Sequence, residues 1–168
     1  AALGSRVVMV EALGSILAGA DSDLARPVKN YAEKAFKEIR VNTKVSKMET
    51  SGKQIKVVMD SEGTKKEELY DYVLVSVGRI PNCDDLGLKN TKVTRDDKGF
   101  IKVNSKQETT DPYILAIGDA AGGALLAHKA SKEARIAVEV ITGEESSFES
   151  IIPAVVFTDP EVAWCGLT

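Results

Sequence analysis

The stretch Tyr113-Ile114-Leu115-Ala116-Ile117-Gly118-Asp119 says most about the fold. Residues 113–117 form a nearly continuous apolar run, which is typical of a parallel strand buried on both faces. Ligands of open α/β sheets bind beyond the carboxyl ends of the strands. There Gly118 would let a ligand approach the backbone, and Asp119 would accept hydrogen bonds from its hydroxyl groups. The stretch therefore predicts an α/β fold with a ligand site after this strand.

A helix is predicted next, over residues 126–141. Its apolar residues recur at helical spacing: Ala127, Ala130, Ala134, Ala137, Val138 and Ile141. The N-terminus of this helix would face the same strand end as Asp119, where its free N–H groups and dipole favour a negatively charged ligand. An ordinary strand, loop and helix, with Asp119 satisfying the loop, has the same spacing. Spacing alone leaves both interpretations open.

The residues themselves resemble a known motif. Ile117-Gly118-Asp119 with Leu126-Ala127-His128 resembles the second flavin-contacting motif of the pyridine nucleotide-disulfide oxidoreductases, and within that family it is most similar to the dihydrolipoyl dehydrogenases. The resemblance implies that Gly118 and Asp119 lie at FAD, with Asp119 bonded to the ribityl chain. It also implies that the helix starting near Ala127 directs backbone N–H groups to the pyrimidine edge of the flavin.

His128 is the only histidine of the chain. No carboxylate stands at a fixed spacing to orient it, so a positioning role is expected. In the family that the sequence resembles, the catalytic His-Glu pair lies further toward the C-terminus. No catalytic residue is therefore assigned within this chain.

A second nucleotide site is predicted at Arg6-Val7-Val8-Met9-Val10-Glu11. A β-branched, apolar run that ends in an acid is how the second strand of a dinucleotide-binding unit ends, and the acid accepts from the adenosine ribose. A Glu in a solvated loop fits the pattern as well. The family resemblance implies that Glu11 holds the ribose of NAD. The Gly-rich turn expected about 20 residues earlier is not in the sequence.

Residues 72–77 predict another doubly buried strand, followed by Gly78-Arg79-Ile80-Pro81-Asn82. This ending resembles the motif at which the family's chain leaves its NAD domain. The resemblance implies that Gly78 admits a ligand and that Arg79 reaches a pyrophosphate or a ribose. A turn with a merely exposed Arg79 is the alternative.

Two further elements complete the prediction. A helix is expected over residues 22–39, with Tyr31 and Phe36 in the core, because apolar residues recur at helical spacing after Asp21-Ser22-Asp23. An antiparallel β-meander is expected from residues 41–49 and 54–60, with turns at Ser51-Gly52 and Glu62-Gly63. The charged residues of the meander, including Lys65-Lys66-Glu67-Glu68, are expected on its solvated face.

Composition limits the partners. The 168 residues carry a net charge of −3, which gives no basic field for nucleic acid or an anionic membrane. No apolar run approaches the roughly 20 residues that cross a bilayer, and the first residues do not have the basic n-region and apolar h-region of a signal peptide. Cys83 and Cys165 form neither a disulfide framework nor a metal-binding pair, so free thiols and a cytoplasmic location are expected. No metal site is predicted.

The chain is expected to be an internal fragment. Gly4 would cap a helix whose body is missing, and Thr168 would cap a helix that does not follow. The family resemblance implies a partial Rossmann-like NAD(P)/FAD-binding fold with the antiparallel meander. It assigns residues 1–82 to the later part of the NAD-binding domain, 83–147 to the returning FAD-binding segment and 148–168 to the start of the dimerisation domain.

The parent protein that the resemblance implies is an enzyme. It would pass electrons from dihydrolipoyl groups, through a redox disulfide and FAD, to NAD. Its partner would be a 2-oxo acid dehydrogenase complex or the glycine cleavage system, and it would be a homodimer. The wording Asp159-Pro160-Glu161-Val162-Ala163 is closer to dihydrolipoyl dehydrogenases than to glutathione or mercuric reductases. Because no CxxxxC disulfide is in the sequence, the isolated chain is expected to be inactive.

Two rivals stay open at this point. One is another flavoenzyme of the same family, of the glutathione, mercuric or transhydrogenase type. The other is a non-catalytic nucleotide-binding module that keeps the scaffold.

Overall fold

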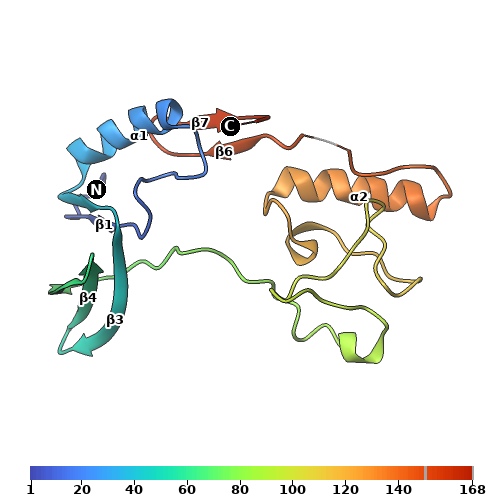
Figure 1. Ribbon diagram of the computed structural model, residues 1–168, viewed down its shortest axis with the longest axis horizontal. Helices are drawn as coiled ribbons and strands as arrows, with labels where there is room; N and C mark the ends of the chain where they lie inside the picture. The colour runs from blue at the N-terminus through green and yellow to red at the C-terminus, as the bar shows by residue number, and fades with distance from the viewer. Residues whose placement is uncertain (150, 168) are drawn as a thin grey trace. The chain divides into compact units, whose positions relative to one another are not determined.

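The computed structural model describes residues 1–149 and 151–167, drawn as a ribbon in Figure 1. The chain divides into two compact units: unit 1 is Ala1–Ser76 with Val155–Thr168, and unit 2 is Val77–Ala154. Thr168, expected to cap a helix, lies outside the described residues, as does Ser150 in the expected dimerisation segment. The assignment of these segments to nucleotide-binding and dimerisation domains stays a prediction.

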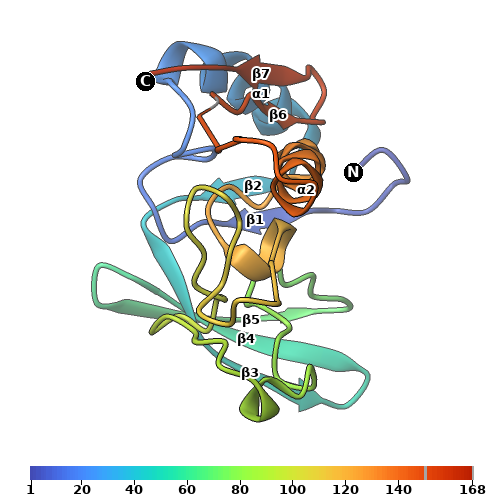
Figure 2. The same cartoon turned by 90° about the vertical axis from the view of Figure 1, so that its right-hand side faces the viewer.

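Unit 1 contains a strand–helix–strand arrangement. Strand β1 (Val8–Val10) pairs in parallel with β2 (Glu38–Arg40), and helix α1 (Ser22–Ala35) connects them. Figure 2 shows β1 and β2 side by side. A short sheet of β6 (Ala154–Val156) and β7 (Val162–Trp164) follows late in the chain. Ile16, Val28 and Val162 form the buried core, so the loop after β1, helix α1 and strand β7 pack together.

Helix α1 ends earlier than predicted. It stops at Ala35, because Phe36 is extended (φ −96°, ψ 154°), and its N–H donates to the Ala32 carbonyl at 2.8 Å. Ile39, expected in the helix, lies in β2 opposite Met9. There the parallel pairing with β1 satisfies the backbone hydrogen-bonding groups of Ile39. Helical periodicity in the sequence gives no sign of this pairing. Tyr31 is 48% exposed, so its predicted place in the core is wrong.

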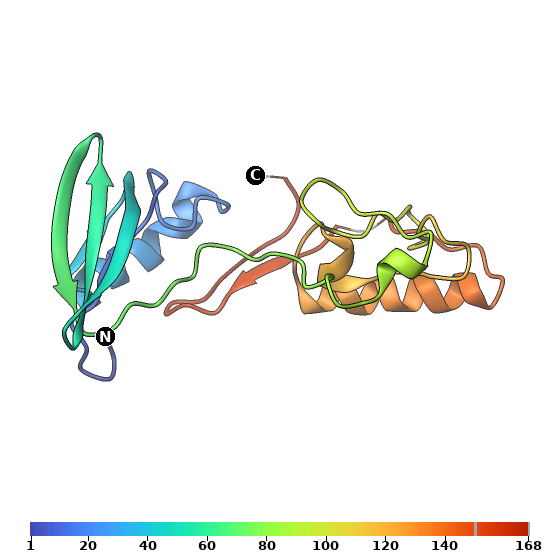
Figure 3. The same cartoon turned by 90° about the horizontal axis from the view of Figure 1, so that it is seen from below.

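The β-meander is confirmed and has a third strand. β3 (Thr43–Ser51), β4 (Gln54–Ser61) and β5 (Thr64–Tyr70) form an antiparallel sheet in the order β3-β4-β5. Figure 3 shows the three strands as adjacent arrows. The turns fall at Gly52 and Gly63, both with positive φ. The charged run expected only as a solvated face is β5 itself.

Charged side chains tie β5 to β2. Arg40 Nη2 donates to Glu68 Oε1 at 2.9 Å, and the Tyr70 hydroxyl donates to Glu68 Oε2 at 2.6 Å. Hydrogen bonds from Arg40, Lys66 and Tyr70 hold the pKa of Glu68 at about 2. Burial, together with the Glu68 carboxylate, raises the pKa of Tyr70 to about 12. Glu68 is therefore kept ionised by its neighbours.

Unit 2 is built from loops around one long helix. Its elements are the 3-10 turns η1 (Leu88–Asn90) and η2 (Gly118–Ala121) and the helix α2 (Ala127–Ile141), which Figure 1 shows in orange. A buried cluster of Cys83, Ile101 and Ala116 forms its core. Single bridges, Arg95 with Ile101 and Glu108 with Leu115, take the place of longer strands.

The two predicted doubly buried strands are corrected by this structure. Within residues 113–117 only Ala116 is buried, Tyr113 is 92% exposed, and the only sheet contact is the bridge at Leu115. Residues 72–77 are extended but unpaired, with Leu74 93% and Val77 91% exposed. A strand is buried on both faces only when neighbouring strands and covering layers surround it. The described residues provide neither for these two runs.

Helix α2 is confirmed, but its buried face differs from the predicted stripe. Ile136 and Ala137 are buried, whereas Val138 and Ile141 are 59% and 69% exposed. Lys129 and Glu133 are buried on the same face as Ile136.

Candidate functional site

The loop at Gly118 has a conformation that favours glycine. Ile117 is extended, and Gly118 then takes a φ of 71° to open the turn η2. A Cβ at Gly118 would stand 3.3 Å from the Ala130 Cβ, because the loop lies against α2. At the other end of the loop, a Cβ at Gly122 would meet the Phe100 ring at 3.1 Å. The two glycines therefore permit a backbone path around Asp119 that residues with a Cβ would adopt only with strain.

Asp119 projects from this loop beside a cation. Its side chain is 55% exposed, and Oδ2 lies 3.7 Å from Arg79 Nη1. The same Arg79 nitrogen donates to the Leu125 carbonyl at 3.0 Å. An exposed pair of this kind contributes little to stability. Both groups are free to exchange their mutual contact for contacts with a ligand.

Arg79 and Asp119 come together, although sequence reasoning placed them at different nucleotides. Arg79 was expected at NAD and Asp119 at FAD. Gly78 has a φ of 123° and open space around it. The carboxylate, the guanidinium and the start of α2 thus form one site within unit 2, which we call the loop site.

The start of α2 carries no side-chain cap. Leu126, the residue before the helix, is extended, and its own N–H donates to the Ala124 carbonyl at 2.9 Å. Ala127 opens the helix at this uncapped end. Unsatisfied N–H groups and the helix dipole favour negative charge at such a terminus.

His128 contacts the protein backbone. Its Nε2 lies 2.6 Å from the Pro153 carbonyl oxygen. A carbonyl only accepts, so Nε2 carries the proton and donates. This contact holds the ring against the segment that follows α2. The positioning role of His128 stays a prediction.

A buried ion pair beneath the loop was missed by sequence reasoning. Lys129 and Glu133 side chains are 5% and 7% exposed, and Lys129 Nζ lies 2.7 Å from Glu133 Oε1. A Lys and a Glu four residues apart usually form a solvated surface pair. The signal that could have found them is the helical spacing that places both on the stripe of Ile136.

Glu11 lies in unit 1, directly after β1 as predicted. Its N–H donates to the Arg40 carbonyl at 2.8 Å, and its Oε1 accepts from the Leu13 N–H at 2.8 Å. The carboxylate therefore shapes its own turn in this structure. Its role at a ribose stays a prediction.

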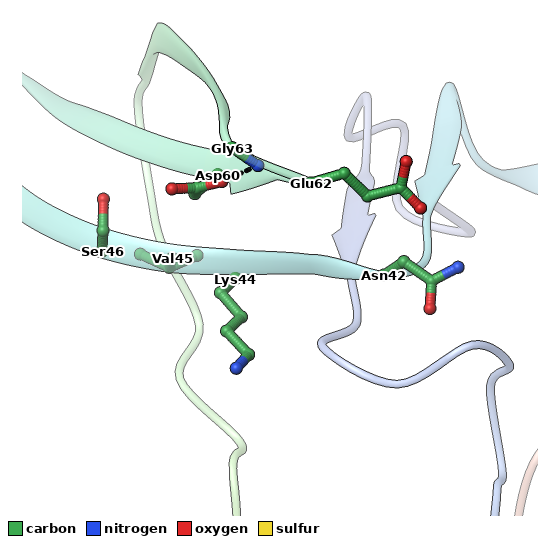
Figure 4. A pocket seen from close by; sticks show the side chains of 7 residues that line it. All are labelled: Asn42, Lys44, Val45, Ser46, Asp60, Glu62 and Gly63. Atoms are coloured by element: carbon green, nitrogen blue, oxygen red, sulfur yellow. Dashed lines mark hydrogen bonds between the residues drawn. The ribbon is translucent and has the colours of Figure 1, made fainter.

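Other features of the described residues add no further site. A hollow of about 460 Å³ on the meander is lined by Asn42, Lys44, Val45, Ser46, Asp60, Glu62 and Gly63, but Figure 4 shows these side chains pointing in different directions. No metal-binding group of His, Cys, Asp or Glu and no helix fit to cross a membrane occurs among residues 1–149 and 151–167. Of the two cysteines, both free, Cys83 is buried and Cys165 is exposed.

Curated relatives cover almost the whole of this chain. Dihydrolipoyl dehydrogenase from Buchnera aphidicola (subspecies Acyrthosiphon pisum) is 41% identical over 169 residues, or 99% of this chain and 36% of that protein. The enzyme of the same name from Haemophilus influenzae is 39% identical over 99% of this chain and 35% of its own length. The chain thus spans about a third of the length of the curated relatives it matches.

Solved structures also match nearly the whole of this chain. LpdA from Mycobacterium tuberculosis superposes with a TM-score of 0.87 at 27% identity, over 98% of this chain and 36% of that one. The HOCl-induced flavoprotein disulfide reductase RclA from Escherichia coli gives a TM-score of 0.84 at 25% identity, over 98% of this chain and 38% of that one. The mixed α/β fold is therefore that of flavoprotein disulfide reductases.

The family model described as "Pyridine nucleotide-disulphide oxidoreductase" matches residues 1–134. That match includes Glu11, Arg79, the loop from Gly118 to Gly122 and the first turns of α2. The chain belongs to the pyridine nucleotide-disulphide oxidoreductase family.

Proposed function

We propose that this chain is part of an FAD- and NAD-dependent dihydrolipoyl dehydrogenase, and that the loop site binds FAD. The observation that carries the proposal is the exposed Asp119 carboxylate, held between two glycines beside Arg79 and the uncapped start of α2. Relatives named dihydrolipoyl dehydrogenase at 39–41% identity support the choice within the family.

The residues of the loop site fit a flavin nucleotide. Asp119 would accept hydrogen bonds from the ribityl hydroxyls. Gly118 would serve this contact by letting the loop lie close against α2. The N–H groups of Ala127 and His128 at the helix start would face an electron-rich edge of the ring. The N–H of Leu126, just before them, is bonded to the Ala124 carbonyl. Arg79 would turn from Asp119 to an anionic part of a nucleotide. FAD, when bound, supplies the electron-accepting chemistry.

Glu11 and Gly78 are proposed for the NAD side. The Glu11 carboxylate would exchange its bond to Leu13 N–H for the adenosine ribose hydroxyls, and it would repel a 2′-phosphate. Residues 12–20 contain no Arg to receive that phosphate. A preference for NAD over NADP follows.

The remaining proposals concern the parent protein. It acts on dihydrolipoyl groups of a 2-oxo acid dehydrogenase complex or the glycine cleavage system. It is a homodimer in the cytoplasm, a location that its free thiols support. Residues 148–168 open its dimerisation domain.

Steady-state assays of the complete protein test this proposal. Dihydrolipoamide with NAD should give turnover, with kcat/KM at least tenfold above that with NADP, which corresponds to about 1.4 kcal/mol. Glu11→Ala should shrink this ratio. Turnover of glutathione disulfide or mercuric ion with NADPH, and none of dihydrolipoamide, would favour the rival flavoenzymes. A protein that binds neither FAD nor NAD would refute the proposal.

A further inference from the structure

The buried pair of Lys129 and Glu133 makes all its contacts with one loop. Lys129 Nζ donates to the Gly122 carbonyl at 2.7 Å and lies 3.4 Å from the Gly118 carbonyl, besides its 2.7 Å contact with Glu133 Oε1. Glu133 Oε2 accepts from the Gly118 N–H at 2.7 Å. An ammonium has three donors, so these partners use all of them. The pair is fully satisfied by η2 and its flanking glycine.

These contacts fasten both ends of the loop that carries Asp119. Gly118 is held through its N–H and its carbonyl, and Gly122 is held through its carbonyl. The Gly122 N–H closes the loop by donating to the Asp119 carbonyl at 3.2 Å. Asp119 itself stays outside, with its carboxylate exposed beside Arg79. The ion pair thus sets the backbone while the ligand-facing side chain remains free.

Stability alone is a poor reason for such a pair. Two charges lose their hydration when they are buried, and well-packed apolar residues of similar volume often do as well or better. In some proteins, buried polar contacts of this kind select one conformation from several that have similar packing. A loop with two glycines at positive φ needs such selection, because glycine permits many other backbone paths.

We infer that Lys129 and Glu133 are positioning residues that hold the loop from Gly118 to Gly122 in the conformation in which Asp119 binds the ribityl chain of FAD. This rests on the proposed function of the loop site. Neither side chain touches the ligand. Both act through the backbone, which lowers the cost of ordering the loop when FAD binds.

The test compares Lys129→Met, Glu133→Gln and the double variant in the complete protein, with Lys132→Met on the exposed face of α2 as the control. Each single variant leaves an uncompensated buried charge, so its thermal midpoint and its FAD affinity should both fall. The double variant removes both charges, and its thermal midpoint should recover. Its FAD dissociation constant should stay about tenfold above wild type, because the loop has lost the donors at its carbonyls.

Hydrogen exchange of the apoprotein gives a second readout. Amides of residues 118–122 should exchange faster in the double variant than in wild type or in Lys132→Met. FAD affinity that recovers together with the thermal midpoint would overturn the inference and leave the pair a purely structural role. A wild-type protein without FAD affinity would overturn the proposed function itself. The two failures are therefore distinguishable.

Discussion

Asp119 is the residue at which the proposed flavin site is most directly tested. In the complete protein, Asp119→Ala should remove charge-assisted hydrogen bonds worth about 1.5–3 kcal/mol, which weakens FAD binding by about 10- to 100-fold. Titration of the apoprotein with FAD, followed by flavin fluorescence, measures this change. Asp97→Ala, in an exposed turn, is the matched control. An Asp119→Ala protein that keeps its FAD as tightly as the control would contradict the assignment.

Single residues were predictable where one strong motif surrounds them. Gly118 was singled out by its motif, and its φ of 71° is a conformation that favours glycine. The proximity of Arg79 to Asp119 was not predictable, because the two are 40 positions apart in the numbering and no periodicity joins them. The burial of Lys129 and Glu133 was not predicted, because charged side chains normally face solvent. Only their hydrogen bonds to the backbone of the neighbouring loop make this burial acceptable.

At the scale of elements, the meander offers a pH-dependent test. The pKa of Glu68 lies near 2 in the folded chain, below its ordinary value of 4.5. Its stabilising contribution is therefore complete above pH 4.5 and is lost as the pH falls toward 2. Glu68→Gln should lower the free energy of unfolding by about 1–3 kcal/mol at neutral pH, and the difference from wild type should vanish near pH 2.

Urea unfolding followed by the fluorescence of Trp164, the only tryptophan, reports on unit 1, where β5 lies. Glu67→Gln is the matched control, because Glu67 is adjacent in β5 and its side chain is 60% exposed. If Glu68→Gln and Glu67→Gln lower the free energy of unfolding by the same small amount at every pH, the Arg40–Glu68–Tyr70 contacts do not stabilise the sheet.

A helix or strand was predictable when the interactions that form it lie within a few residues along the chain. Helix α2 and the hairpins of the meander follow from helical spacing and from glycine turns, which act within a few residues. The end of α1 depended on the pairing of Ile39 with β1, which lies outside any local window. The apolar runs at 72–77 and 113–117 failed for the same reason, since burial of a strand is decided by distant neighbours.

At the scale of the whole molecule, the 168-residue chain by itself should not oxidise dihydrolipoamide. It contains no Gly-x-Gly turn to hold a pyrophosphate and no CxxxxC dithiol, and its two thiols cannot replace one. The purified chain should be colourless and inactive with NAD and dihydrolipoamide. Visible absorption spectra and the NADH assay measure both properties. A yellow, active preparation of these residues alone would refute the prediction.

The exposed run Tyr72-Val73-Leu74-Val75-Ser76-Val77 has a consequence for handling the protein. Leu74 and Val77 are more than nine-tenths exposed, and the run has high β-propensity with no charge and no proline. Extended segments of this composition template cross-β aggregation between copies. The isolated chain should therefore form thioflavin-positive aggregates at high concentration. Leu74→Lys should delay them in a sedimentation assay, whereas Lys53→Gln in the β3–β4 turn should not. Residues 72–77 were expected to pair within a parallel sheet, and without that pairing they promote the formation of fibrils.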